Sequence, residues 1–178
     1  MKRRLPAVCL AVAVLVADLA SKHCIFAWFD SAGIRSGQVS WIFGEWFGLA
    51  RVMNPGVTGG IGSFLGPVFL SIFTAVASVG IALYLLLPKG HDRWTLVSLA
   101  LILGGAVGNL YDRVIFGEVR DFIDVWPRLP WPSWLHHWPT FNIADSGIVV
   151  GVVMLVVHSL FLAKKTAAHG SEDSSREM

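Results

Sequence analysis

The sequence predicts an all-α integral membrane protein with four transmembrane helices and a small extracytoplasmic β-rich loop. Of its 178 residues, 54% are apolar and only 15% are charged, whereas a soluble domain carries about 25% charged residues. The mean hydropathy is +0.63, which excludes a disordered chain and an ordinary water-soluble globule. A spanning helix needs about 20 mainly apolar residues. Four long stretches carry no charge, between Arg4 and Asp18, Arg51 and Lys89, Arg93 and Asp112, and Asp145 and Lys164.

The uncharged stretches place the helices near residues 5–27, 65–87, 94–113 and 142–163. Pro67 fits the first turn of the second helix, where its missing N–H costs nothing. Pro88 is expected to end that helix, because proline cannot continue it. The sequence therefore predicts one membrane domain over residues 1–166 and a polar, disordered cytoplasmic tail over residues 167–178.

Basic residues predict the orientation of the helices. They precede the first helix, occupy the short link between the second and third, and follow the fourth, and these places share one side if the spans alternate. The positive-inside rule makes that side cytoplasmic, so both termini are expected inside and the connections 28–64 and 114–141 outside. The residues concerned are Lys2, Arg3, Arg4, Lys89, Arg93, Lys164 and Lys165.

Aromatic residues mark the outer connections, as expected for the headgroup level of a bilayer. The β-branched and aromatic residues of 39–52 predict a short sheet lying on the membrane. Only Trp94 lies on the predicted inner side. The other tryptophans, all in or beside the outer connections, are Trp28, Trp41, Trp46, Trp126, Trp131, Trp134 and Trp138.

Several function classes lack their signature. A net charge of +2 without a long basic run speaks against a nucleic-acid partner. Cys9 and Cys24 lie too far apart on one helix for a disulfide, and neither belongs to a zinc-like spacing. There is no H-E-x-x-H motif for zinc and no G-x-S-x-G elbow, so the signatures of rival protease classes are missing.

The informative residues are polar groups at the outer ends of the predicted helices. Asn109 and Asp112 form one N-x-x-D unit, and Asn142 and Asp145 form another. Each unit puts an amide and a carboxylate on one helix face. Because the third helix runs outward and the fourth runs inward, both units reach the same depth.

Each of these residues also has a plain structural interpretation. Asp18 and Lys22 are an i,i+4 pair, and Asn142 can be an N-cap with Asp145 in the first turn. Asp112 opposes the helix dipole and needs an ion pair with Arg113 or another base. Asp121 and Asp124 follow in the second outer connection and can be loop acids.

Convergence of several carboxylates near one membrane interface favours function, because ionisable groups are costly there. Paired carboxylates in a low-dielectric pocket share one proton, and such a pair can act as general acid and base on a peptide. The alternatives are a small proton- or cation-coupled transporter and a non-catalytic membrane subunit. A transport path needs polar groups through the whole membrane, and the last three helices are uncharged below their outer ends, which favours an enzyme.

Four motifs in order resemble the lipoprotein signal peptidases, or signal peptidase II, over nearly all of the chain to about residue 163. The first three are Asp18-x-x-Ser21-Lys22, Asn54-x-Gly56, and Gly108-Asn109-x-x-Asp112-Arg113 with Gly117-x-Val119-x-Asp121-Phe122. The last is Phe141-Asn142-x-Ala144-Asp145-Ser146. The sequence departs from the family after Asn54-Pro55-Gly56, where Val57-Thr58-Gly59-Gly60 replaces small residues and a phenylalanine.

The resemblance implies an intramembrane aspartic endopeptidase with Asp121 and Asp145 as its catalytic dyad. It implies substrate-binding or dyad-supporting roles for Asn54, Asn109, Arg113 and Asn142. Asp18, Lys22 and Asp112 match supporting positions.

The implied substrates are prolipoproteins carrying diacylglyceryl-cysteine, cut just before that cysteine. The implied location is the bacterial cytoplasmic (inner) membrane, with the active site near the outer face. We expect membrane lipids as neighbours and a monomer.

Overall fold

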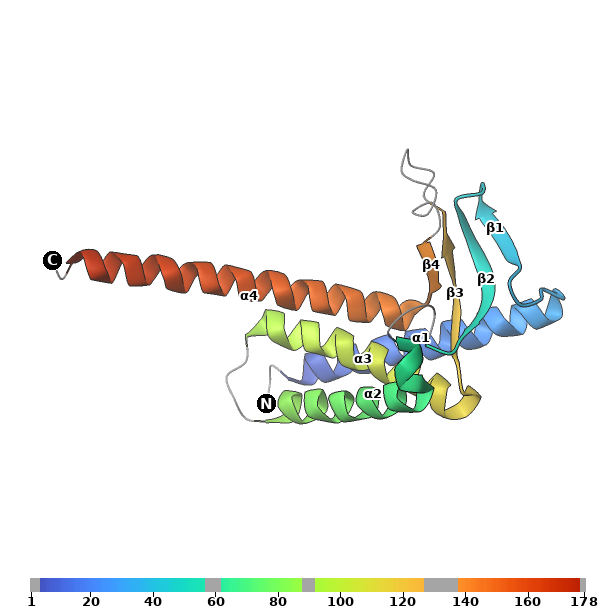
Figure 1. Cartoon of the computed structure of the whole chain (residues 1–178), viewed down its shortest axis with the longest axis horizontal. Coiled ribbons are helices and arrows are strands. Elements are labelled where there is room, and N and C mark those ends of the chain that lie inside the picture. The colour runs from blue at the N-terminus through green and yellow to red at the C-terminus, as the bar shows by residue number, and fades with distance from the viewer. Residues whose placement is uncertain (1–3, 57–61, 88–91, 127–137, 177–178) are drawn as a thin grey trace.

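The computed structural model describes residues 4–56, 62–87, 92–126 and 138–176 (Figure 1). Four helices are long and apolar enough to cross a membrane, as the sequence predicts. The elements run in the order α1 (Leu5–Ser31), β1 (Val39–Phe43), β2 (Phe47–Asn54), α2 (Gly62–Leu86), α3 (Arg93–Phe116), β3 (Val119–Val125), β4 (Trp138–Phe141) and α4 (Ile143–Arg176).

Helix α3 is the centre of the bundle and packs against α1, α2 and α4. Small residues allow this close approach, as is common between membrane helices. A Cβ atom on Gly104 would lie 2.5 Å from the backbone oxygen of Ala11 in α1. One on Gly105 would collide with the backbone oxygen of Ala144 in α4. The backbones of α1 and α4 are thereby held directly against the helix that carries Asn109 and Asp112.

Helix α2 is broken near its start. Gly66 has φ 68° and ψ 159°, a conformation that glycine adopts readily and other residues do not. The membrane-spanning part is Gly66–Leu86, so Pro67 does lie at its beginning. Pro88, predicted to end this helix, lies outside the described residues.

Helix α4 is longer than the sequence predicts. It continues to Arg176, past the expected end near residue 163 and through most of the tail expected to be disordered. Its 34 residues correspond to about 51 Å, and Figure 1 shows α4 projecting far beyond the other helices. The tail contains no proline, and Lys164, Lys165, Ala167 and Ala168 are good helix formers, so nothing in the sequence stops the helix.

A four-stranded antiparallel sheet in the order β1-β2-β3-β4 stands at one end of the helices (Figure 1). Strands β1 and β2 confirm the sheet predicted for residues 39–52. Strands β3 and β4 come from the second long connection, residues 114–141, where no strand was expected. Asp121 and Asp124 are therefore strand residues and not loop acids. The predicted interface residues Trp131 and Trp134 lie outside the described residues.

Candidate active site

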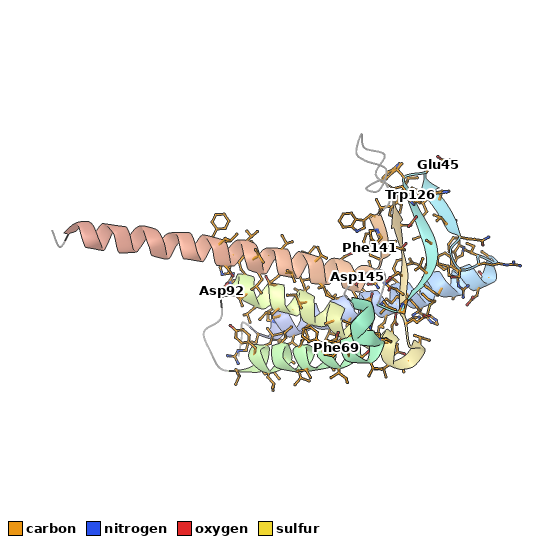
Figure 2. The ribbon with its side chains drawn as sticks, in the orientation of Figure 1. Glu45, Phe69, Asp92, Trp126, Phe141 and Asp145 are labelled. Atoms are coloured by element: carbon orange, nitrogen blue, oxygen red, sulfur yellow. The ribbon has the colours of Figure 1, made fainter. Side chains whose placement is uncertain are left out.

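The site lies where the sheet meets the helices. Asp145 is at the sheet end of α4, whereas Asp92 is near the opposite end of the bundle (Figure 2). The site residues come from five elements. Asp18 and Lys22 lie on α1, Asn54 on β2, Asn109, Asp112 and Arg113 on α3, Asp121 on β3, and Asn142 and Asp145 at the start of α4.

Asp121 is a buried carboxylate held by two amides. It is 1% exposed. Asn54 Nδ2 donates to its Oδ2 at 2.8 Å, and Asn142 Nδ2 donates to its Oδ1 at 2.7 Å. Burial, with a smaller contribution from the charge of Asp145, raises the pKa of Asp121 to about 6 against the lowering effect of the two amides. This carboxyl can therefore exchange a proton near neutral pH.

Asp145 is less buried and has its own pair of donors. Asn109 Nδ2 donates to its Oδ1 at 2.7 Å, and the backbone N–H of Asn142 donates to its Oδ2 at 3.3 Å. In return, Asn142 Oδ1 accepts from the backbone N–H of Asp145 at 2.9 Å. This reciprocal arrangement is a helix-capping box. The capping interpretation of Asn142 is thus correct, and the same contacts also fix the position of Asp145.

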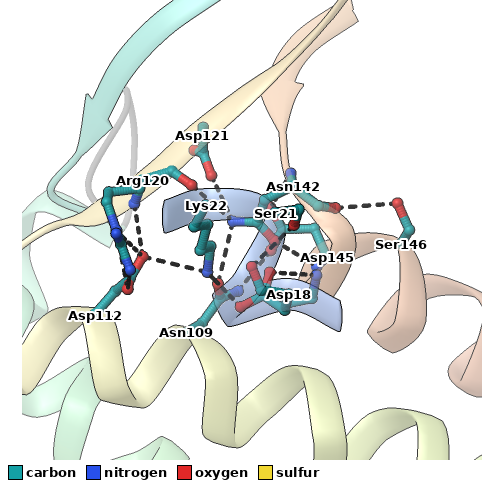
Figure 3. Close-up of polar contacts among 11 residues, drawn as sticks. Asp18, Ser21, Lys22, Asn109, Asp112, Arg120, Asp121, Asn142, Asp145 and Ser146 are labelled. Atoms are coloured by element: carbon teal, nitrogen blue, oxygen red, sulfur yellow. Dashed lines mark hydrogen bonds and ion pairs between the residues drawn. The ribbon is translucent and has the colours of Figure 1, made fainter. Parts of the chain in front are cut away.

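Asn142 connects the two carboxylates. Its side chain donates to Asp121 and to Asn109 Oδ1, at 3.1 Å for the latter, while its own oxygen holds the backbone of Asp145. The residue is 0% exposed. A single amide offers two donors and one acceptor, and here both kinds are used to tie Asp121 to Asp145 (Figure 3).

The ammonium group of Lys22 binds the side chains of Asp18, Asn109 and Asp112. It is 0% exposed, and its Nζ lies 2.7 Å from Asp18 Oδ2, 2.9 Å from Asn109 Oδ1 and 3.2 Å from Asp112 Oδ2. All three ammonium protons have an acceptor. The predicted i,i+4 pair of Asp18 and Lys22 is confirmed, and it is also part of a larger buried network.

Asp18 joins α1 to α4. Its Oδ1 accepts from the backbone N–H of Ala144 at 2.9 Å, the residue just before Asp145. A Cβ atom on Gly108 would lie 2.5 Å from Asp18 Oδ2, so only glycine leaves room for this carboxylate. The hydrogen bond between Asp18 and Ala144 therefore fixes the position of the Asp145 backbone.

Asp112 pairs with Arg120, a residue that the sequence analysis did not single out. Arg120 Nη2 lies 2.7 Å from Asp112 Oδ1, and the backbone N–H of Arg120 donates to Oδ2 at 3.0 Å. The guanidinium also lies over the Phe116 ring, 4.5 Å from its centroid. The sequence predicts Arg113 or another base as the partner of Asp112. The structure shows another base, Arg120, in this role and not Arg113. Arg120 immediately precedes Asp121, so this pair anchors the strand that carries the buried carboxylate.

Within the described part of the chain, Arg113 takes part in none of the hydrogen bonds and ion pairs of this network. It is half-buried, and its Nε has no hydrogen-bond partner in the described part of the chain. The carboxylates of Asp145, Asp121 and Asp112 interact electrostatically with its guanidinium. Gly56 lies beside it, since a Cβ there would be 3.5 Å from Arg113 Nη2. A guanidinium in this position can bind a carbonyl oxygen next to the two acids.

Asp124 has a different environment from Asp121. Three residues apart on one strand, their side chains point to opposite faces. Asp124 is 1% exposed and accepts from Trp126 Nε1 at 2.7 Å and from Thr140 Oγ1 at 3.0 Å. These contacts join β3 to β4, so Asp124 supports the sheet.

Comparisons with known proteins show which proteins this chain resembles. A family model described as Signal peptidase (SPase) II matches residues 10–161. The chain is 36% identical over 172 residues to a lipoprotein signal peptidase of Rhodopirellula baltica, covering 93% of this chain and 75% of that protein. It is 36% identical over 177 residues to one of Pseudomonas aeruginosa, covering 94% and 95%. For one of Moorella thermoacetica it is 40% identical over 151 residues, covering 85% and 90%.

The fold is also that of a solved bacterial membrane enzyme, determined by the in meso method at 1.9 Å resolution. The TM-score is 0.67 at 24% sequence identity, over 87% of this chain and 92% of the other.

Proposed function

The chain belongs to the signal peptidase II family, which removes signal peptides from prolipoproteins, and we propose that it does so with Asp121 and Asp145 as its catalytic dyad. The alternative of a small transporter is not supported by these comparisons. The observation that carries the proposal is the position of Asn142 between the two acids. Its side-chain amide donates to the Asp121 carboxylate, and its backbone N–H donates to the Asp145 carboxylate.

The dyad would work as a coupled acid–base pair. Two close carboxylates disfavour double ionisation, so the pair holds one proton and titrates as a unit. One carboxylate takes a proton from water as the water attacks the scissile carbonyl. The other donates its proton to the carbonyl oxygen, which gives a tetrahedral intermediate. As the C–N bond then breaks, the proton taken from water goes to the leaving amine, and a hydroxyl proton of the intermediate returns to the second carboxylate and restores the dyad.

The neighbouring residues would bind the peptide and orient the dyad. Asn54 and Asn109 each donate to one carboxylate, which keeps the acceptor atoms directed at the reacting bond. Arg113, with its Nε unpartnered among the described residues, would bind a substrate carbonyl. No step of this mechanism calls for a metal or an organic cofactor.

The proposal also covers the bond that is cut in the substrate and the orientation of the protein in the membrane. The cut would fall just before a diacylglyceryl-cysteine, with the enzyme a monomer in the bacterial inner membrane and the dyad near the outer face. The basic residues before α1 and after residue 163 support cytoplasmic termini. Labelling of cysteines introduced at Ser36 and Ser171 tests this orientation, because reaction of both from the same side contradicts it.

The activity is tested with purified protein and a diacylglyceryl-modified prolipoprotein. The expected product is a mature lipoprotein that begins with the modified cysteine, identified by mass spectrometry. The same prolipoprotein without the diacylglyceryl group is the matched control and should be cut far more slowly. Equal cleavage of both would contradict the proposed substrate class.

A further inference from the structure

Arg120 is a buried arginine that the proposed mechanism does not use. It is 9% exposed and lies on β3, directly before Asp121. Neighbouring residues of a strand point to opposite faces, so these two side chains leave β3 on different sides. Burial of a charge is costly unless good contacts compensate for it. The contacts of Arg120 are therefore expected to serve a purpose that outweighs this cost.

The guanidinium group is enclosed by one carboxylate and two aromatic rings. Nε and Nη2 donate to Asp112, and the shortest of these bonds is 2.7 Å. The guanidinium carbon lies 4.5 Å from the centroid of the Phe116 ring and 5.9 Å from that of the Phe26 ring. Asp112 and Phe116 belong to α3, whereas Phe26 belongs to α1. The planar group of Arg120 is thus held by two helices at once.

The backbone of Arg120 is held at the same place. Its N–H donates to Asp112 Oδ2 at 3.0 Å, and its carbonyl oxygen accepts from Asn142 Nδ2 at 3.5 Å. The same nitrogen of Asn142 donates to Asp121 Oδ1 at 2.7 Å. The two peptide groups that flank Arg120 are therefore both hydrogen-bonded, and the second of them leads directly to Asp121.

Asp112 also connects Arg120 to the other acid of the dyad (Figure 3). Lys22 Nζ lies 3.2 Å from Asp112 Oδ2 and donates to Asn109 Oδ1 at 2.9 Å. Asn109 in turn donates to Asp145. One route from Asp112 thus reaches Asp145 through Lys22, and a second route, through Arg120, reaches its partner acid. Asp112 is therefore a common anchor for both carboxylates of the dyad.

We propose that Arg120 is a positioning residue, which holds the Asp121 carboxylate at the distance from Asp145 that sharing of a proton requires. This inference rests on the proposed function. Among the described residues, the side chain of Arg120 is hydrogen-bonded only to Asp112, so it acts on the dyad through β3. A displacement of about 1 Å at a reacting group can lower a rate about 100-fold. Loosening of β3 therefore affects the chemical step more than it affects substrate binding.

Arg120→Lys tests the proposal, because lysine keeps the charge and loses the planar fork. Cleavage of a diacylglyceryl-modified prolipoprotein is measured with folded, full-length protein. We expect kcat to fall about tenfold and KM to stay within about twofold of the wild type. If only the charge of Arg120 mattered, kcat would be unchanged. If the residue only stabilised the fold, the melting temperature would fall and kcat of the folded protein would be unchanged. Either result would overturn the proposal.

Arg51→Lys is the matched control. Arg51 lies on the neighbouring strand β2, and its guanidinium carbon is 5.6 Å from the centroid of the same Phe26 ring. Its ion-pair partner, however, is the exposed Asp30, and an exposed ion pair contributes little. This variant should keep kcat within about twofold of the wild type. A loss of kcat equal to that of Arg120→Lys would contradict the specific role of Arg120.

Phe116→Leu serves as a second variant if Arg120→Lys does not fold. It removes one ring beside the guanidinium and leaves the bonds to Asp112 in place, so kcat should fall about two- to threefold at an unchanged KM. An unchanged kcat would contradict the proposal. Asp121→Asn is measured beside these variants. Cleavage by the wild type and its loss in Asp121→Asn support the dyad whatever the Arg120 variant shows, so the two proposals fail separately.

Discussion

Two groups of buried carboxylates lie within the same network and differ in what compensates their charge. Asp18 and Asp112 are paired with Lys22 and Arg120, so two acids are balanced by two bases. Asp121 and Asp145 are hydrogen-bonded by amides and backbone N–H groups, and the described residues give neither of them an ion pair at salt-bridge distance. The first group is a neutral structural unit, whereas the second holds negative charge without a bonded cation.

This difference explains why only one group suits catalysis. Asp18 and Asp112 are bound by Lys22, Arg120 and backbone N–H groups, so their oxygens hold the network together. Burial raises the pKa of Asp121 to about 6 despite its two amide donors, so this carboxyl can exchange a proton near neutral pH. We therefore propose that the ion network supports the structure of the site and that Asp121 and Asp145 transfer the proton.

The largest expected effect comes from breaking the ion network. Lys22→Met leaves Asp18 and Asp112 with buried charge and removes the donor to Asn109. Removing one partner of a buried pair costs about 3–5 kcal/mol. We expect a large loss of thermal stability in detergent, measured by the melting temperature. A melting temperature near that of the wild type would show that the network is not structural.

The next effect concerns the link between the two acids. Asn142→Ala removes the donor to Asp121 and the helix cap, and hydrogen bonds to charged groups contribute about 1.5–3 kcal/mol. Cleavage should fall roughly 10- to 100-fold in folded protein, as measured by initial rates. Arg113→Ala, at a residue whose Nε has no hydrogen-bond partner among the described residues, is the matched comparison and should raise KM more than it lowers stability. Full activity in both variants would remove their assigned roles.

A smaller effect is expected from pH. The folded-state pKa of Asp121 is raised from 3.8 to about 6, so the folded state binds the proton more tightly than the unfolded state. Its contribution to stability is therefore fully present below pH 3.8 and is lost as pH rises through 6. Between pH 5 and 7 the loss is about 1 kcal/mol. Melting curves at both pH values should show it in the wild type and not in Asp121→Asn.

The smallest effect is expected at Asp124. Asp124→Asn keeps an oxygen that can accept from Trp126 or Thr140, so stability should fall by less than about 1 kcal/mol. Cleavage should stay near the wild-type rate, because this side chain faces away from Asp121. An abolished cleavage in folded protein would place Asp124 in the catalytic machinery.

Much of this molecule can be predicted from local sequence. Uncharged stretches locate the four helices because the bilayer excludes charge over a fixed length. The spacing of Asn142 and Asp145 predicts a cap because capping depends on neighbouring residues only. The motifs containing Asp121 and Asp145 identify the family that the comparisons confirm.

Other features depend on contacts that local sequence does not contain. Strand β3 is buried on both faces, including Arg120, Asp121 and Asp124, so it lacks the polar–apolar alternation of a surface strand. The pairing of Asp112 with Arg120 requires the chain to turn back after α3. That turn could have been anticipated from Gly117, which has φ 78° at the end of the helix, a common stop signal.

The central claim, that Asp121 and Asp145 act as one catalytic pair, is tested most directly by replacing each with asparagine. Asparagine is nearly isosteric with aspartate and cannot transfer the proton. Asp121→Asn and Asp145→Asn should each fold, bind a diacylglyceryl-modified prolipoprotein and show no measurable cleavage, and the double variant should lose little more than either one. Binding and cleavage are measured separately in one detergent preparation. Cleavage near the wild-type rate by either folded variant would contradict the assignment.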